Sequence, residues 1–426
     1  MQQAIEVAPT RGGSVLPQVA GVIGNVLEWY DFAAYGFLAA TFAVNFFPLE
    51  NHLLSLLASY GVFAAAFVMR PLGGVLFGHI GDRVGRRMAL VISVLAMAVP
   101  SFAIGLLPTY AGVGVLAPVL LILLRMIQGV SIGGELTISI VYLGERSTGR
   151  HRGVSASLSF VGAVVGTLIG SLLISTLDST LGAEAMRTWG WRIPFLCSAV
   201  LGALGLALRM AGLEEAAEPI ARTRRAPVIV AFTTEWRAML LAFLISIPSG
   251  AAYYVGFIYL VTFAHQYDAL PAAQANLVVT GGLLTLLFGV PLAAALSDRV
   301  GRRPVMLAGV IGQLLLAWPL FAIATNHRLW ELRGWEILFA IAQSMVSGPM
   351  PAMLAERFPA RVRCTASSIS YNAAMTLLGG TGPMIVVYLI AVSGVPTAPS
   401  WYVMATSIAA AIGILLARER AGTALT

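Results

Sequence analysis

Long apolar stretches alternate with short polar or Gly/Pro-rich breaks along the whole chain. Each stretch is about 20 residues long or longer, which is the length that a helix needs to cross the hydrocarbon core of a bilayer. We therefore predict an all-α membrane protein with twelve transmembrane helices. The predicted spans are 18–44, 54–79, 88–108, 114–143, 154–176, 191–211, 238–264, 273–297, 304–325, 335–355, 365–392 and 400–417.

A charged segment separates the first six spans from the last six. We predict an N-terminal six-helix bundle at 1–212, a cytoplasmic linker at 213–236 and a C-terminal six-helix bundle at 237–426. The first apolar stretch is long enough to span and no cleavage signal precedes it, so we expect it to be retained as a helix. Two such bundles are the architecture of a rocking transporter with its site between the halves.

Charge is scarce, because 58% of the residues are hydrophobic and only 11% are charged, against about 25% in a soluble domain. This composition excludes a soluble enzyme, a nucleic-acid binder and a disordered scaffold. The 26 basic residues are all arginine, and most of them fall in the loops that follow the even-numbered spans. The positive-inside rule then places both termini in the cytoplasm of a multi-pass plasma membrane protein, which we expect in a bacterial inner membrane.

Two motifs occur once in each half of the chain. Residues 81–87, Gly-Asp-Arg-Val-Gly-Arg-Arg, return as Ser-Asp-Arg-Val-Gly-Arg-Arg at 297–303. A Glu-Arg pair with two further arginines follows span 4 and returns after span 10 at a similar offset, as Glu145 and Arg150 in the first copy and Glu356 in the second. The repetition indicates a duplicated six-helix unit.

These residues resemble the major facilitator superfamily, whose loop signature Gly-x-x-x-Asp-Arg-x-Gly-Arg-Arg matches residues 78–87. Residues 28–32, 70–74, 128–135 and 189–195 further resemble its metabolite:proton symporter family. The resemblance covers nearly the whole chain and implies import of an organic acid, such as citrate or 2-oxoglutarate, or of a zwitterion such as proline or glycine betaine. It implies a proton as the coupling ion and no cofactor.

The repeated loops predict a latch that closes the cytoplasmic side. Glycine in such a loop permits a tight reversal, aspartate can pair with arginine, and arginines can bind helix C-terminal carbonyls or anionic lipid. The resemblance implies that this latch holds the halves together while the site faces outward. The predicted gate residues are Asp82, Arg83, Gly85, Arg86, Arg87, Glu145, Arg150, Asp298, Arg299 and Glu356. The alternative is that these arginines only set the topology.

Ionisable residues gather on one face of span 1 and on one stripe of span 4. At 100° per residue, Glu28, Asp31 and Tyr35 share a face that Asn25 borders, while Arg125, Gln128 and Glu135 lie along one stripe. A carboxylate in the bilayer costs about 2.5–3.5 kcal/mol and is therefore paired, protonated or open to water. We predict two neighbouring proton-coupling clusters, Asp31 with Arg125, and Glu28 with Arg70 and Glu135.

For Asp31 the alternatives are structural ion pairing and direct contact with substrate. For Glu28 and Glu135 a structural or gating role is favoured over proton binding. For Arg70, the alternative is that it satisfies carbonyls freed by the proline that follows it. The resemblance to sugar/proton members of the superfamily implies that Asp31 and Arg125 form the coupling pair.

The central parts of spans 7 to 11 carry polar but uncharged residues, so we expect every embedded ionisable group to lie in the first half. Three embedded acids against two arginines leave no surplus cation for a tricarboxylate. We therefore favour a monocarboxylate or zwitterion whose carboxylate meets Arg125 and whose other end meets tyrosines, through cation–π contact. The predicted substrate residues are Asn25, Tyr35, Arg125, Gln128, Tyr253, Tyr254, Tyr371 and Asn372.

Several alternatives remain open. Protonation of Asp31 or Glu28 would free an arginine and admit a di- or tricarboxylate. A drug/proton antiporter is disfavoured because Thr167 stands where such exporters carry proline in span 5, and the glycines around it then indicate close helix packing. A sensor or an enzyme is disfavoured because no signalling domain, nucleophile–base pair or metal motif appears. We expect a monomer in the lipid bilayer whose partners are a metabolite and protons, with no nucleic acid and no metal.

Overall fold

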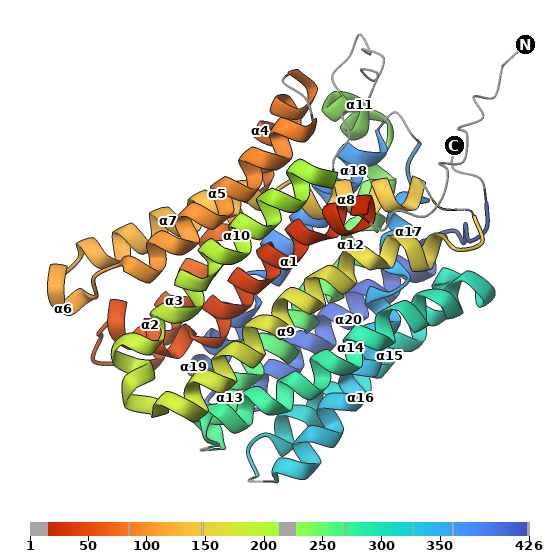
Figure 1. Ribbon diagram of the computed structural model, residues 1–426. Helices are drawn as coiled ribbons and strands as arrows, with labels where there is room; N and C mark the ends of the chain where they lie inside the picture. Colours follow the sequence, from red (N-terminus) through yellow and green to blue (C-terminus); the bar gives the residue numbers. More distant parts are fainter. Residues whose placement is uncertain are drawn as a thin grey trace, which may run out of the picture.

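The computed structural model describes residues 16–83, 86–145, 147, 149–212, 227–268, 270–326, 328–359 and 362–423. Within these ranges the side chains of 16–18, 20–21, 75, 78–83, 86–91, 142, 145, 212, 227 and 272–273 are not described. The chain is helical from end to end of the described part, and the helices run side by side at a common tilt (Figure 1).

The first half holds six spans, several of them broken into two helices. They are α1 (Leu16–Phe37) with α2 (Ala39–Phe46), α3 (His52–Val68) with α4 (Arg70–Arg83), α5 (Arg86–Leu106), α7 (Leu116–Ile132) with α8 (Glu135–Glu145), α9 (Arg152–Ala185) and α10 (Arg192–Gly212). A short helix, α6 (Tyr110–Val113), precedes α7, and a π-helical turn, η1 (Met186–Gly190), links α9 to α10.

The second half holds six more. They are α12 (Trp236–Tyr253), η2 (Tyr254–Tyr259) and α13 (Leu260–Tyr267) as one span, α14 (Ala272–Val300), α15 (Arg302–Ile323), α16 (Leu329–Ser347) with α17 (Met350–Ala355), α18 (Arg363–Ala374), η3 (Met375–Gly379) and α19 (Gly382–Ser393) as one span, and α20 (Ala398–Leu416). The helix α11 (Pro227–Thr234) falls inside the predicted linker, whose residues 213–226 lie outside the described part.

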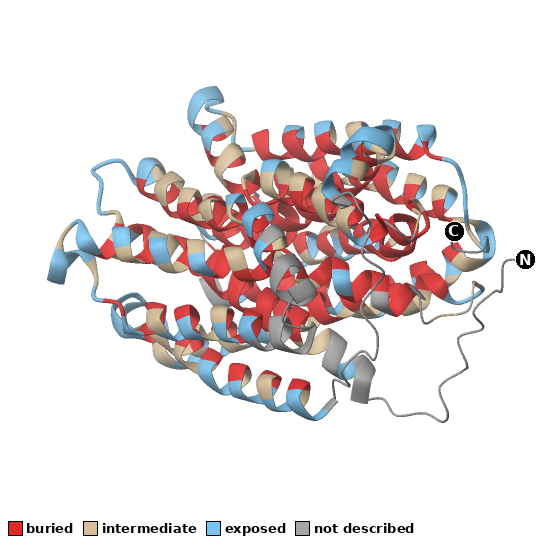
Figure 2. Ribbon diagram, turned by 90° about the horizontal axis from the view of Figure 1, so that it is seen from above, coloured by how far each residue is buried: buried red, intermediate tan, exposed pale blue. Residues whose placement is uncertain are grey.

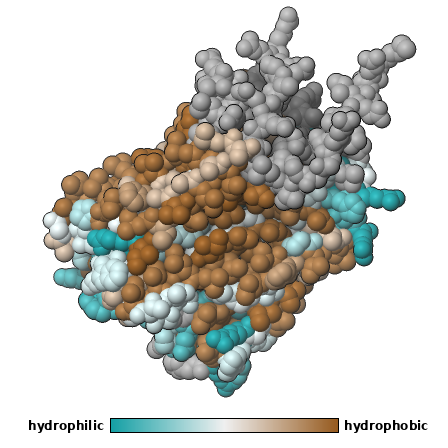
Figure 3. All heavy atoms as spheres, viewed as in Figure 1, coloured by the Kyte–Doolittle hydropathy of each residue, from teal (hydrophilic) through white to brown (hydrophobic). Residues whose placement is uncertain are grey.

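Ten of the described helical segments are long and apolar enough to cross a membrane, and α5 adds the shorter apolar segment Ile92–Leu106. With α1 they complete the expected twelve spans, so the predicted fold class is confirmed. The described surface carries a broad hydrophobic band with hydrophilic residues at its two ends, as the bilayer requires (Figure 3). Buried residues are concentrated in the interior of the helix bundle, and exposed residues lie mainly at its periphery and in the loops (Figure 2).

Glycines let the first-half helices approach to backbone contact. On α9, a side chain at Gly166 would overlap the Val26 carbonyl of α1, and one at Gly162 would overlap Val22. This bears out the close packing expected of the span 5 glycines. On α7, a side chain at Gly129 would overlap the Ala66 carbonyl of α3. The close approach brings α1, α3 and α7 together around the ionisable residues that they carry.

Candidate functional site

The predicted pair of Asp31 and Arg125 forms in the centre of the first half. Arg125 Nη1 lies 3.3 Å from Asp31 Oδ2. Gln128 links the two, because its Nε2 donates to the same Asp31 oxygen at 2.6 Å while its Oε1 accepts from Arg125 at 2.8 Å. Asp31 and Arg125 are 1% and 0% exposed. Such burial makes the pair sensitive to any movement of α7 against α1, because each charge depends on the other.

Aromatic rings enclose the guanidinium of Arg125. Its central carbon lies 4.2 Å from the ring centre of Phe32 and 4.4 Å from that of Tyr35. Two of its nitrogens, Nε and Nη2, have no hydrogen-bond partner among the described residues. The hydroxyl of Tyr35, in contrast, already donates a hydrogen bond to the Ser59 carbonyl at 3.1 Å. Arg125 therefore keeps donors that a carboxylate could accept from.

Glu28 and Arg70 form the second expected pair. Arg70 Nη2 donates to Glu28 Oε1 at 2.8 Å, and both side chains are buried. Pro71 removes the N–H that would bond the Phe67 carbonyl, and that carbonyl accepts instead from the hydroxyl of Thr376 in η3, at 2.7 Å. The alternative role for Arg70, satisfying carbonyls freed by the proline, is therefore not the one seen at Phe67.

The expected contact of Glu135 with Arg70 is corrected by the structure. Glu135 pairs with Arg209 of α10 and accepts from Ser93 Oγ at 3.0 Å. Arg209 lies near the end of the predicted span 191–211, and it is 1% exposed. Gly24 makes this possible, because a side chain there would overlap both Glu135 and Arg209. The fold thus brings span 6 into a cluster that the sequence predicted from spans 1, 2 and 4.

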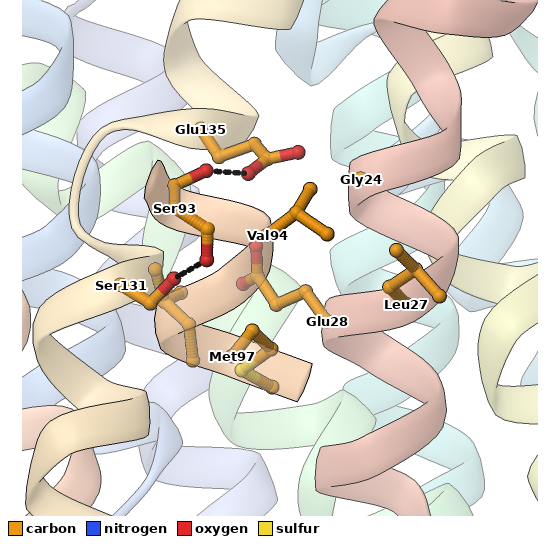
Figure 4. A pocket seen from close by; sticks show the side chains of 9 residues that line it. Gly24, Leu27, Glu28, Ser93, Val94, Met97, Ser131 and Glu135 are labelled. Atoms are coloured by element: carbon orange, nitrogen blue, oxygen red, sulfur yellow. Dashed lines mark hydrogen bonds between the residues drawn. The ribbon is translucent and has the colours of Figure 1, made fainter. Parts of the chain in front are cut away.

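Glu28 and Glu135 line the same small pocket between α1, α5, α7 and α8 (Figure 4). Its volume is about 10 Å³, about the size of one water molecule. Ser93 and Ser131 connect its walls, since Ser131 Oγ donates to the Ser93 carbonyl at 2.5 Å. Among the described residues of the first-half core, the acids Glu28, Asp31 and Glu135 thus pair with the arginines Arg70, Arg125 and Arg209 one to one.

Aromatic residues of both halves meet at the centre. Trp29 of α1 is stacked on Tyr254 with ring centres 5.8 Å apart, and Tyr253 approaches it edge-on at 5.3 Å. The Tyr253 hydroxyl contacts Thr167 of α9 at 2.7 Å, whereas Trp29 Nε1 has no partner among the described residues. Tyr253 and Tyr254 thus come together as expected, and Trp29 joins them.

Some of the other predicted substrate residues have polar atoms without a hydrogen-bond partner among the described residues, and others already make hydrogen bonds. Asn25 is fully buried with both amide atoms unpartnered, and the Tyr371 hydroxyl is also unpartnered, within the described part of the chain. Asn372 donates to the Gly133 carbonyl at 2.8 Å, which lies at the break between α7 and α8. Asn372 therefore ties the second half to the first in this conformation.

Cytoplasmic contacts between the halves form around the second copy of the loop motif. Asp298 accepts from the backbone N–H groups of Gly153 and Val154 at 3.0 and 3.2 Å, at the first turn of α9, where a helix favours an anion. Arg302 pairs with Asp298 at 2.6 Å and with Glu356 at 3.1 Å. Glu356 also pairs with Arg152 at 3.2 Å. The predicted gate residues Asp298 and Glu356, both in the second half, thus each contact the start of α9 in the first half.

The remaining gate predictions fare differently. Arg150 and Arg299 are exposed, and it is Arg152 rather than Arg150 that reaches the other half, which corrects the sequence assignment. Gly85 lies outside the described residues, as do the side chains of Asp82, Arg83, Arg86, Arg87 and Glu145. At the position equivalent to Gly85, Gly301 has φ +100°, which bears out the tight turn in the second copy.

The opposite end is also closed by contacts between the halves. Tyr60 of α3 meets Thr262 of α13 at 3.0 Å, and Ser171 of α9 meets Thr280 of α14 at 2.7 Å. Asn276 donates to Asp178 at 3.2 Å. With both ends held, the conformation is a closed one.

Sequence reasoning missed a buried acid in the second half. Glu336 of α16 is 0% exposed, which contradicts the expectation that all embedded ionisable groups lie in the first half. Its position inside the predicted span 335–355 was the available signal, but its closeness to the end of that span suggested a loop residue.

Residues 18–217 match the Sugar (and other) transporter family, and residues 242–424 match the Major Facilitator Superfamily. The chain is 30% identical to a proline/betaine transporter of Salmonella typhimurium over 95% of its own length and 84% of that protein. It is 32% identical to a citrate–proton symporter of Klebsiella pneumoniae over 96% of its length and 93% of that protein. Its fold matches a xylose transporter of E. coli with a TM-score of 0.76 at 18% identity, covering 96% and 99% of the two chains.

Proposed function

Because the chain belongs to the metabolite:proton symporters of the major facilitator superfamily, we propose that it imports a small zwitterionic carboxylate together with protons by alternating access. It is a multi-pass membrane transporter and not an enzyme. The observation that carries the proposal is the buried Asp31–Arg125 pair beside an uncharged aromatic layer to which the second half contributes.

Asp31 and Arg125 form the proton-coupling pair of the proposal. The arginine holds Asp31 ionised while the two remain close, and separation of the pair leaves a buried carboxylate whose best alternative is to take a proton. The two arginine nitrogens without partners are placed to bind the carboxylate of a substrate. Binding of that carboxylate would weaken the hold of Arg125 on Asp31 and so link substrate to proton.

Trp29, Tyr253 and Tyr254 form the proposed site for the cationic end of the substrate. Their rings stand stacked and edge-on to one another, and aromatic faces bind substituted ammonium groups with about 0.5–2 kcal/mol each. In the core of the first half three acids pair with three arginines, so a substrate without net charge leaves these pairs balanced. This balance favours a zwitterion such as proline or betaine, and Asn25, Gln128, Tyr35 and Tyr371 complete the proposed lining.

The other clusters have supporting roles in the proposal. Glu28 with Arg70 and Glu135 with Arg209 couple movements of α1, α4, α8 and α10 to the proton site. Arg152, Asp298, Arg302 and Glu356 latch the cytoplasmic side, and Asn372 adds to that closure through Gly133. The bundles at 1–212 and 237–426 rock against each other within one monomer in the bilayer, joined by the segment 213–236.

A di- or tricarboxylate is the second candidate, and the presence of three buried arginines favours it. Protonation of Glu28 or Glu135 would free Arg70 or Arg209 for a second carboxylate. A thermal-shift screen of the purified protein with betaine, proline, 2-oxoglutarate, shikimate and citrate separates the two candidates. We expect betaine or proline to stabilise the protein, whereas stabilisation by citrate or 2-oxoglutarate alone would overturn the zwitterion proposal.

Uptake into proteoliposomes tests the coupling. The identified substrate should accumulate under an inward proton gradient, and uptake that persists unchanged after both the pH and voltage gradients are collapsed would contradict symport. Asp31→Asn is expected to abolish uphill accumulation and to retain exchange of substrate across the membrane. The matched control is Glu184→Gln, because Glu184 lies exposed in a surface ion pair.

A further inference from the structure

Glu336 is a buried acid that the proposed mechanism does not use. It lies on α16 with 0% exposure, and neither of its carboxyl oxygens has a hydrogen-bond partner among the described residues. It sits seven residues after Leu329, where α16 begins, which places it roughly 10 Å from the periplasmic end of that helix at 1.5 Å per residue. A fully buried carboxyl without a partner is rare and requires an explanation.

The surroundings of this carboxyl are apolar and closely packed. A side chain at Gly282 of α14 would lie 2.7 Å from Glu336 Oε1 and 3.0 Å from Phe257 of η2. Phe257 in turn packs on Phe339, with ring centres 6.0 Å apart. Glycine at 282 therefore leaves the space that the carboxyl occupies, between α14 and the π-helical turn η2.

Among the described residues, the helices packed on α16 bring no cation to this level. The titratable residues of α14 and α15 all lie at the cytoplasmic ends of those helices, and α17 has none. On α16 itself, Arg333 stacks on the exposed Trp330 with 4.7 Å between its guanidinium carbon and the ring centre. The titratable and charged residues of the elements packed on α16 are Asp298, Arg299, Arg302, Arg303, Arg237, Tyr253, Tyr254, Tyr259, Glu331 and Arg333.

An ionised carboxylate in this place would be buried without a counter-charge or a donor. Such a group costs so much that it takes a proton instead. The closed conformation therefore suits only the protonated side chain. Once water reached it, the carboxyl would ionise and lose its proton to that water.

We propose that Glu336 is a second proton-binding site, in the C-terminal half, and that its protonation is required for the periplasmic side to close. The reaction is the binding of one proton from periplasmic water to the Glu336 carboxylate before α14, α16 and η2 pack around it. Reopening hydrates the carboxyl and returns the proton. The inference rests on the proposed symport, but Glu336 controls closure while Asp31 carries the coupling.

The position of η2 links closure of the periplasmic side to the proposed substrate site. Tyr253, which precedes η2, stacks on Phe257 with ring centres 5.4 Å apart, and a π-helical turn is a common point of adjustment at functional sites. One continuous set of rings therefore joins Glu336, through Phe257 and Tyr253, to Trp29. Movement of η2 changes the packing around Glu336 and the aromatic layer together.

The experiment compares Glu336→Gln, which is neutral and of the same shape, with Glu331→Gln on the exposed face of the same helix. The first readout is the infrared C=O band of un-ionised carboxyl groups in the purified protein at neutral pH. Glu336→Gln should remove part of this band and Glu331→Gln should not. An unchanged band in Glu336→Gln means that Glu336 is ionised, which overturns the proposal.

The second readout is substrate exchange in proteoliposomes as external pH rises. The population of a singly protonated state falls about tenfold for each pH unit above the pKa. The exchange rate of the wild type should therefore fall with rising pH by about tenfold per unit more than that of Glu336→Gln, which needs no proton at this position. If the exchange rate falls equally with pH in both proteins while the infrared band is lost in Glu336→Gln, the carboxyl of Glu336 is neutral at all times. This result would also overturn the proposal. Failure of the symport itself would appear in the wild-type uptake and would leave the infrared result unaffected.

If Glu336→Gln exchanges no substrate at any pH, the infrared band is measured on it as well. If the variant has lost the infrared band and still exchanges no substrate at acid pH, the proposed role is contradicted, because a neutral residue should close the periplasmic side most readily. Glu336→Asp supplies a titratable variant with a shorter side chain, in which the steep alkaline limb should return.

Discussion

The aromatic residue Trp29 stands between the two acids of span 1 and links them to the other half. Its neighbours on α1, Glu28 and Asp31, are each paired with an arginine, and its own ring packs on those of Tyr253 and Tyr254. Its own indole N–H is unpartnered within the described residues. Trp29 therefore connects the helix that carries both acids to the aromatic residues of the second half.

Replacement of Trp29 by alanine should weaken binding of a zwitterion about tenfold, since a buried cation–π contact contributes about 1–2 kcal/mol. The apparent KM for uptake should rise while the accumulation ratio stays, because the Asp31–Arg125 pair is left in place. Trp29→Phe keeps an aromatic face and should retain most of the affinity. Equal loss in both variants would indicate that the indole N–H, and not the ring face, contacts the substrate.

At the scale of the helices, glycine determines which side chains meet. The α1–α9 contact at Gly166 places the two backbones so close that any larger residue would overlap Val26. The α7–α8 break at Gly133 frees a carbonyl that accepts hydrogen bonds from Asn372 and Ser368 of the second half. Small residues in this protein thus set both the packing within a half and the contacts between halves.

Gly166→Val should destabilise the protein by about 1–3 kcal/mol, the cost of overpacking a closely packed site. The thermal unfolding temperature of the purified protein measures the effect. Gly281→Ala on α14 is the control, because nothing lies within 4 Å of the added carbon there. A similar loss in the control would mean that glycine flexibility, and not the α1–α9 contact, determines the stability.

Glu419 holds the start of α15 against the tail. Partial burial raises its pKa, but hydrogen bonds from the backbone N–H groups of Arg303, Ala421, Arg302 and Arg420 outweigh that effect and hold the pKa below the usual 4.5. Because the folded pKa is the lower one, this stabilisation is present above pH 4.5 and is lost as the pH falls through the folded value. Glu419→Gln should therefore lower the unfolding temperature at pH 7 and narrow its difference from the wild type in acid. A difference that stays constant with pH would contradict the charged contact.

At the scale of the whole molecule, the two halves are joined by polar contacts at both ends. On the cytoplasmic side, Glu356 bridges Arg152 of the first half and Arg302 of the second. Alternating access requires these contacts to break while the periplasmic ones hold. The cytoplasmic latch therefore consists of charged pairs whose partners water can replace when the two halves separate.

Arg152→Gln should open the cytoplasmic side more often. The rate of alkylation of a cysteine placed at Ser368, in a chain with Cys197 and Cys364 replaced by serine, measures the opening, because Ser368 contacts the Gly133 carbonyl across the halves. We expect a severalfold faster rate. Arg150→Gln is the matched control, since Arg150 is exposed two residues away; an equal rise there would assign the effect to net charge alone.

Local patterns were enough for the spans, the duplication and the pairing of Asp31 with Arg125. Both members of that pair follow from helical faces and depth, which depend on residues close in sequence. The partner of Glu135 could not be found in this way, because Arg209 comes from a helix whose order around the bundle no local pattern specifies. The role of Arg152 could not be found in this way either. Local sequence does not distinguish it from Arg150, because its partner Glu356 lies in the other half of the chain.

The sequence by itself determined that this chain is a twelve-span, twofold-repeated membrane protein with its charges held at the cytoplasmic loops and on one face of spans 1 and 4. The length of the hydrophobic segments, the placement of the arginines and the helical periodicity are local properties of the chain, and they determine how it inserts into the bilayer and in which orientation. Only the tertiary structure decided that Glu135 pairs with Arg209 and that Glu336 is buried with no hydrogen-bond partner among the described residues. Its neighbours Phe257 and Gly282 come from two other spans, and contacts across a helix bundle arise from packing that local sequence does not encode.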